Sequence, residues 1–159
     1  MPITGTSTDY TGRKKDISIL QGVNPAQLTT VAPSFGKISQ YCAGIQKLIQ
    51  RYAICLLTEI GSQANNPTFG TNLISTLLSS SSKINQADVY HIFNFANANV
   101  IQSFRDYQRK NAGLPTDEQI DTTKLIGISV KADTISLNIQ VFPITGTPVV
   151  FLIPLPSSS

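Results

Sequence analysis

The sequence predicts an α+β fold in which three helices pack on a small antiparallel sheet, a three-stranded meander at the C-terminal end. Apolar residues recur every three or four positions through the first two thirds of the chain, which is the period of an amphipathic helix. The period then changes to two near residue 126, as in strands with one buried face. The 159 residues suffice for one domain with its own core. We expect an N-terminal arm at residues 1–15, the domain at 16–155 and a tail at 156–159.

A short strand and a linker are expected before the first helix. Residues 16–20 suit a strand, and residues 24–35 contain two prolines, which favour an extended chain. The first helix is predicted at about 34–60 from a stripe of apolar residues at i, i+3 and i+4 spacing, and Gly61 follows its end. Gly44 inside this helix would cost about 1 kcal/mol relative to alanine, so we expect a close neighbour there.

Two further helices are predicted, at about 70–78 and 86–110. Asn85 is a suitable N-cap for the last helix, and Asp88 lies in its first turn. Basic residues occupy its last turn, in agreement with the helix dipole. These basic residues are Arg105, Arg109 and Lys110.

Three strands are predicted after the helices. The first has Ile126, Ile128 and Val130 on one face, alternating with small or polar residues. The second, at 135–141, alternates in the same way, and the third is predicted at 149–153. Turns separate the three strands, so we expect an antiparallel meander with one face packed on the helices.

The last strand is the segment with the most functional content. It is a continuous apolar run, Val149, Val150, Phe151, Leu152 and Ile153. A strand solvated on one face should alternate, so this run predicts cover on both faces. The helices cover one face, and we expect another subunit to cover the second. As the last strand of the meander it would form an edge that a partner uses. In the alternative, residues 17–20 fold back over it.

The composition favours a permanently assembled protein. Charged residues make up 13% of the chain, about half the usual share. Ser, Thr, Asn and Gln contribute 53 of the 159 residues, so the surface must be polar but mostly uncharged. Charge depletion is typical of the cores of protein interfaces.

The basic residues give little support for nucleic-acid binding. The net charge is only +3, and the one basic run, Arg13, Lys14 and Lys15, has no interleaved aromatic residues. We expect this run to be a solvated or partner-pairing arm and predict no nucleic-acid partner. A phosphate-binding arm is the alternative, with strong salt dependence of DNA binding as its test.

The two cysteines predict a reducing compartment. Cys42 and Cys55 fall on the same predicted helix, where their backbones would lie about 20 Å apart, too far for a disulfide. We expect both to be small buried apolar residues. Residues 1–10 lack the apolar core of a signal peptide, and no apolar run has transmembrane length. We therefore expect synthesis in the cytoplasm and no membrane partner.

No residue pattern predicts catalysis, a metal site or a cofactor site. His91, the single histidine, has no serine or cysteine placed to partner it, and we expect a partly buried structural role. Metal-ligand spacings and phosphate-binding glycine loops do not occur. Glu59 is the one carboxylate placed to serve a cell-wall hydrolase. We expect it instead to bind backbone amides near Gly61 or a partner's cation, and we predict a protein that is not an enzyme.

The segment 46–78 carries a family resemblance. An amphipathic helix ends in Leu-x-Thr-x-x-Gly, a short loop follows, and Pro-x-Phe-Gly precedes a Leu-rich helix. The matching residues are Leu56 or Leu57, Thr58, Gly61, Pro67, Phe69, Gly70, Leu73 and Leu77. This order resembles the baseplate wedge proteins, or sheath initiators, of contractile phage tails, whose relatives occur in type VI secretion baseplates. The resemblance extends over about residues 16–155, mainly in the order of elements. We expect Thr58, Gly61, Pro67, Phe69 and Gly70 to fix the angle between two helices.

The resemblance implies a structural subunit of the virion's tail baseplate, synthesised in the host cytoplasm. Such a subunit templates sheath assembly, because arms of sheath subunits add strands to its sheet, which we place at 149–153. The implied partners are other wedge proteins and the sheath protein, with the tail tube as a further candidate and six copies expected around the tail axis. A tail connector or terminator is the alternative structural role, and a cell-wall hydrolase is the enzymatic alternative.

One family motif is degenerate in this chain. Many relatives carry Glu-Pro-Arg just before the first strand of the meander, where it helps to dock neighbouring wedge proteins. Thr122, Thr123 and Lys124 stand there in this sequence. Lys124 supplies a charge but lacks the bidentate geometry of arginine. This departure argues against a close type VI homologue and against an unchanged docking mode.

Overall fold

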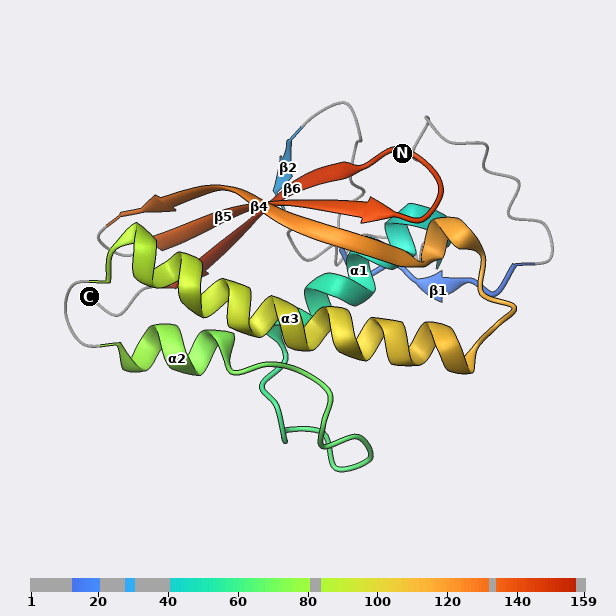
Figure 1. The fold of residues 1–159 in the computed structure, drawn as a ribbon, viewed down its shortest axis with the longest axis horizontal. Helices are drawn as coiled ribbons and strands as arrows, with labels where there is room; N and C mark the ends of the chain where they lie inside the picture. The colour runs from blue at the N-terminus through green and yellow to red at the C-terminus, as the bar shows by residue number, and fades with distance from the viewer. Residues whose placement is uncertain (1–12, 21–27, 31–40, 81–83, 132–133, 157–159) are drawn as a thin grey trace.

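The computed structural model describes residues 13–20, 28–30, 41–80, 84–131 and 134–156. It confirms the predicted α+β class, with three helices and an antiparallel three-stranded meander at the C-terminal end (Figure 1). The elements are β1 (Asp16–Ile17), β2 (Thr29–Thr30), β3 (Tyr41–Cys42), α1 (Gly44–Leu57), α2 (Leu73–Ser79), α3 (Gln86–Lys110), η1 (Thr116–Glu118), β4 (Ile120–Val130), β5 (Thr134–Pro143) and β6 (Val149–Pro156). Residues 1–12 of the expected arm, 157–159 of the tail, most of the expected linker and residues 34–40 of the expected first helix lie outside the described residues.

Helix α3 has the predicted bounds and the predicted cap. The Asn85 side chain accepts from the Asp88 backbone N–H at 3.0 Å, and the Asp88 carboxylate accepts from the Asn85 N–H at 3.2 Å. This reciprocal pair satisfies two amide donors that a helix start leaves without partners. Local sequence alone determines this start, which explains why it was predictable.

Helix α1 begins at Gly44, ten residues later than predicted. Tyr41 and Cys42 fit the helical spacing, but they pair with β1 in a two-stranded antiparallel sheet. Ala43 is extended, and Gly44 has a φ of +63°, which favours glycine. The placement of both cysteines on one helix was therefore wrong, and Gly44 starts the helix rather than interrupting it.

Both cysteines are buried and free. Burial, together with the nearby Asp16 carboxylate, raises the pKa of the Cys42 thiol from 9.0 to about 11, and burial also raises the pKa of Cys55. A raised folded-state pKa means that the contribution of Cys42 to stability is complete below pH 9 and is lost as the pH rises through about 11.

We expect both thiols to react slowly with an alkylating reagent at pH 8, because the thiolate is the reactive form. Iodoacetamide labelling followed by mass spectrometry measures the rate, with glutathione as the accessible control. Labelling should become complete in guanidinium chloride. Rapid modification of Cys42 in the folded protein would contradict its burial.

Strand β4 starts at Ile120, six residues before the predicted strand. Its pairing with β5 shifts register between Leu125 and Gly127, which is a bulge. Ile126 consequently faces outward and is 52% exposed, so its predicted place on the core face was wrong. Leu125 packs against the core instead, followed after the bulge by Ile128.

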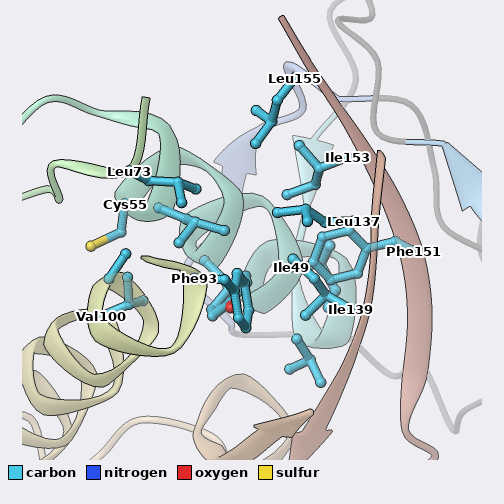
Figure 2. Packing of buried hydrophobic residues seen from close by; sticks show 14 of the residues in the cluster. Ile49, Cys55, Leu73, Phe93, Val100, Leu137, Ile139, Phe151, Ile153 and Leu155 are labelled. Carbon is cyan, nitrogen blue, oxygen red and sulfur yellow. The ribbon is translucent and has the colours of Figure 1, made fainter. Parts of the chain in front are cut away.

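One apolar core joins the helices to the sheet (Figure 2). The Tyr52 ring of α1 makes edge contacts with two other rings. Its centroid lies 6.4 Å from that of Phe104 in α3 and 6.0 Å from that of Phe151 in β6. Its hydroxyl donates to Asn97 Oδ1 of α3 at 2.7 Å, and the same oxygen accepts from Thr123 Oγ1 of β4 at 2.8 Å. Asn97 thus joins α1, α3 and β4. No described helix is long and apolar enough to cross a membrane.

Candidate assembly surface

Strand β6 contains the five residues predicted to bind a partner strand. Val149, Phe151 and Ile153 are buried in the core, while Val150 and Leu152 are only partly buried. Burial therefore alternates along β6, and the described part of the chain covers its outer face only in part. Cover of that face by another subunit stays a prediction. The outer face of β6 keeps partly accessible apolar side chains.

Strand β6 is not the outermost strand of its sheet. The order is β2-β6-β5-β4, and β2 pairs with β6 in parallel through Thr29 opposite Phe151 and Thr30 opposite Leu152. The alternative that residues 17–20 fold back over β6 was also wrong, since β1 pairs with β3. Residues 29–30 of the predicted linker lie beside β6 instead.

Prolines limit the outer side of β6. Lys131 and Thr134 exchange backbone hydrogen bonds, so the N–H and C=O of Thr134 point toward β4. Every second residue of β5 repeats this direction, and the backbone groups of Ser136 therefore point toward β4 as well. Pro154 stands opposite Ser136, so its backbone nitrogen faces the β2 side, where it has no hydrogen to donate. The nitrogen of Pro156 also faces the β2 side and has no hydrogen to donate. The outward N–H donors of β6 are therefore those of Val150 and Leu152.

The opposite edge of the sheet, β4, is closed at both ends by helix α3. The Gln108 amide donates to the Ile120 carbonyl at 3.2 Å and accepts from the Ile120 N–H at 2.8 Å, as a neighbouring strand would. Gln86 donates to the Ile128 carbonyl at 3.1 Å. Together with the bulge at Ile126, these contacts protect an edge that would otherwise invite strand pairing.

The three residues at the degenerate docking motif lie inside β4, not before it. Thr122 and Lys124 are exposed, whereas Thr123 is partly buried through its bond to Asn97. The Lys124 ammonium lies 5.4 Å from the Phe142 ring centroid, a cation–π contact within the sheet. Only Thr122 and Lys124 thus offer side chains to a partner at this position.

The segment between α1 and α2 forms a tight backbone clamp. The Thr71 N–H donates to the Thr58 carbonyl at 2.8 Å, and the Ile60 N–H donates to the Thr71 carbonyl at 3.0 Å. Glu59 and Thr71 therefore form an isolated parallel bridge. The buried Thr71 hydroxyl donates to the Leu56 carbonyl at 2.7 Å, so the start of α2 is tied to the last turn of α1.

The residues of the family resemblance shape this clamp. Gly70 has a φ of +109°, and a Cβ there would lie 2.4 Å from the Thr58 carbonyl oxygen. Gly61 has a φ of +81° and donates its N–H to the Pro67 carbonyl at 3.0 Å. Phe69 packs against the core from the side of the loop. Each of these residues contributes to the connection between the two helices.

The residues considered for chemistry stand apart from one another. Ser75 Oγ donates to Glu59 Oε1 at 2.7 Å, so the carboxylate binds a side-chain hydroxyl rather than the backbone amides near Gly61. The alternative expectation, a partner's cation, stays a prediction. His91 is exposed beside Tyr90, not partly buried, at a ring-centroid distance of 6.0 Å. Among the described residues, no group of three or more His, Cys, Asp or Glu side chains could hold a metal ion.

Sequence reasoning missed a buried carboxylate. Glu118 is 2% exposed, and its Oε1 accepts from the Gly44 N–H at 2.9 Å while Oε2 lies 3.1 Å from Lys47 Nζ. It therefore caps α1 from 74 residues away in sequence. The adjacent Asp117 receives two hydrogen bonds from Arg13 Nη1, at 2.8 and 2.9 Å. Pro115, the residue directly before η1, is the mark of this turn in the sequence.

Searches against protein-family models, curated proteins and solved structures give no match to this chain.

Proposed function

We propose that this protein is a structural subunit of a contractile tail baseplate, which templates sheath assembly by receiving an extended arm of a sheath subunit on its sheet. The observation that carries the proposal is the difference between the two sides of the sheet. Side chains of α3 close the β4 edge, while in the described residues only two residues of β2 pair with the eight of β6. A partner strand is thus directed to the β6 side.

Backbone pairing would supply the affinity. Each added hydrogen bond contributes about 0.5–1.5 kcal/mol net, and the partly buried Val150 and Leu152 add apolar contact on the outer face. An arm would displace the two-residue β2 and pair with the outward N–H groups of Val150 and Leu152 and with the outward carbonyls up to Pro156. Such recognition needs few specific side chains. The same proposal includes other wedge proteins as neighbours and several copies around the tail axis.

Leu152→Pro tests this proposal. The substitution removes an outward N–H that faces β2 and that the arm would use after displacing β2, while the pairing with β5 is kept, as at the native Pro154 and Pro156. Particles assembled with this variant are expected to contain tail tubes but no ordered sheath. Negative-stain electron microscopy of particles from coexpressed tail proteins measures the fraction with sheaths.

Val130→Pro is the matched control, because the Val130 backbone groups face the outer side of β4. Its particles should carry normal sheaths, and circular dichroism should show that both variants fold. Normal sheaths with Leu152→Pro would refute strand addition at β6. Labelling of this protein at the tail end remote from the baseplate would instead favour the connector or terminator role.

A further inference from the structure

Two hollows meet at the C-terminal end of α3, on either side of Tyr107. One of about 560 Å³ is lined by Arg13, Lys14 and Lys47 among others. The second, of about 270 Å³, is lined by Arg51 and Lys110 with polar groups of the α1–α2 loop. Figure 1 shows that β1 and the C-terminal end of α3 lie at the same end of the molecule. Five basic side chains thus border one continuous stretch of surface.

The carboxylates of this region are already bound within the chain. Arg13 binds Asp117, Lys47 binds Glu118, and Arg109 binds Asp106. The side chains left without a salt bridge to any residue that the structure describes are Lys14, Arg51 and Lys110. The surface around Tyr107 therefore carries an excess of positive charge that the folded chain does not neutralise.

The Arg51 guanidinium contacts two aromatic rings and no carboxylate of the described residues. Its Cζ lies 4.1 Å from the ring centroid of Tyr107 and 5.4 Å from that of Phe104. Contact with aromatic rings occupies the face of a guanidinium and leaves the N–H groups at its edge available. The two rings thus restrict the side chain to few conformations, so little entropy is lost when the N–H groups bind a ligand.

We propose that Arg51 binds a carboxylate of an acidic segment from a partner protein. A planar guanidinium matches a carboxylate with two parallel hydrogen bonds. Asn66 and Ser103 line the same hollow and offer further donors, and Lys110 borders it. Lys14 in the adjacent hollow would attract the next acidic residue along the segment. This site does not depend on the strand addition proposed for β6.

Charge distribution favours an acidic peptide over a nucleic acid. Asp106 lines the smaller hollow and Glu118 the larger one, and Asp117 lies beside them. A continuous phosphate backbone would bring its charges close to these carboxylates, whereas single peptide side chains can reach Arg51 between them. Complementarity here is to separated negative charges.

Fluorescence anisotropy with a fluorescein-labelled peptide of three Glu residues alternating with three Gly residues, at low ionic strength, tests the proposal. We expect binding that weakens with salt and a Kd raised about tenfold to a hundredfold by Arg51→Gln, the range for losing a charge-assisted bidentate pair. Arg51→Lys should recover little affinity, because it retains the charge but not the two-point geometry. Lys110→Gln, at an exposed position, should weaken binding by a smaller factor.

Lys131→Gln, in the β4–β5 turn, is the charge-matched control and should leave the Kd unchanged. Thermal unfolding of each variant separates loss of binding from loss of fold. An unchanged Kd for Arg51→Gln would overturn the proposal. Equal or tighter binding of labelled hexathymidylate, with the same dependence on Arg51, would also overturn it in favour of phosphate recognition.

Discussion

Replacing Glu118 with alanine is expected to lower the free energy of unfolding by about 3–5 kcal/mol, the range for removing one partner of a buried ion pair. The Glu118 side chain is 2% exposed and that of Lys47 is 13% exposed. Alanine would leave the Lys47 ammonium without its counter-charge and the Gly44 N–H without its acceptor. Urea unfolding monitored by circular dichroism measures the change.

Two further variants divide this effect into its parts. Glu118→Gln keeps an acceptor for the Gly44 N–H but removes the charge, so its destabilisation should be smaller than that of alanine. Asp117→Ala removes a neighbouring ion pair whose side chains are 26% and 21% exposed, and should cost about 1 kcal/mol or less. Equal effects of Glu118→Ala and Asp117→Ala would show that burial of Glu118 has no energetic consequence.

Gly70→Ala is expected to destabilise the protein by about 3 kcal/mol or more, because backbone strain and a steric clash act together. The φ of +109° is unfavourable for alanine, and its Cβ would meet the Thr58 carbonyl oxygen at 2.4 Å. The clash involves backbone on both sides, so relief requires separating α1 from the start of α2. The midpoint of urea unfolding is the measurement.

The other glycines provide graded controls. Gly61 has a φ of +81° but nothing within 4 Å of a built Cβ, so Gly61→Ala should cost only the left-handed conformation, about 1–2 kcal/mol. Gly113 has neither feature, and its alanine variant should stay within about 0.5 kcal/mol of the parent. An effect of Gly70→Ala no larger than that of Gly61→Ala would argue against the close approach to Thr58.

Local sequence predicted the elements whose causes are local. The bounds of α3 followed from the Asn85 cap and the apolar stripe, and the first two strands of the meander were found from their alternation. Residues 41–42 were misassigned because helical spacing of apolar side chains does not exclude pairing with a strand 24 to 26 residues away. The bulge that turns Ile126 outward depends on β5, so its own strand contains no sign of it.

The features of the candidate sites depend on contacts that are distant in sequence. The clamp at Gly70 was anticipated because its glycine, proline and threonine lie within one short segment. The cap that Glu118 places on α1, and the contact of Arg51 with Tyr107, join residues 74 and 56 positions apart. Parallel pairing of β2 with β6 is equally remote. No pattern of spacing predicts such meetings.

The three side-chain amides that bond α3 to β4 are evenly spaced along the helix. Gln86, Asn97 and Gln108 are each eleven residues apart, which is about three helical turns, so all three lie along one line of the helix. Apolar side chains can find new neighbours when a helix slides by one turn, about 5.4 Å, but that shift would break all three amide contacts at once. Helix α3 therefore has a single discrete position on the strand. We therefore expect α3 and β4 to resist sliding past each other along the helix axis.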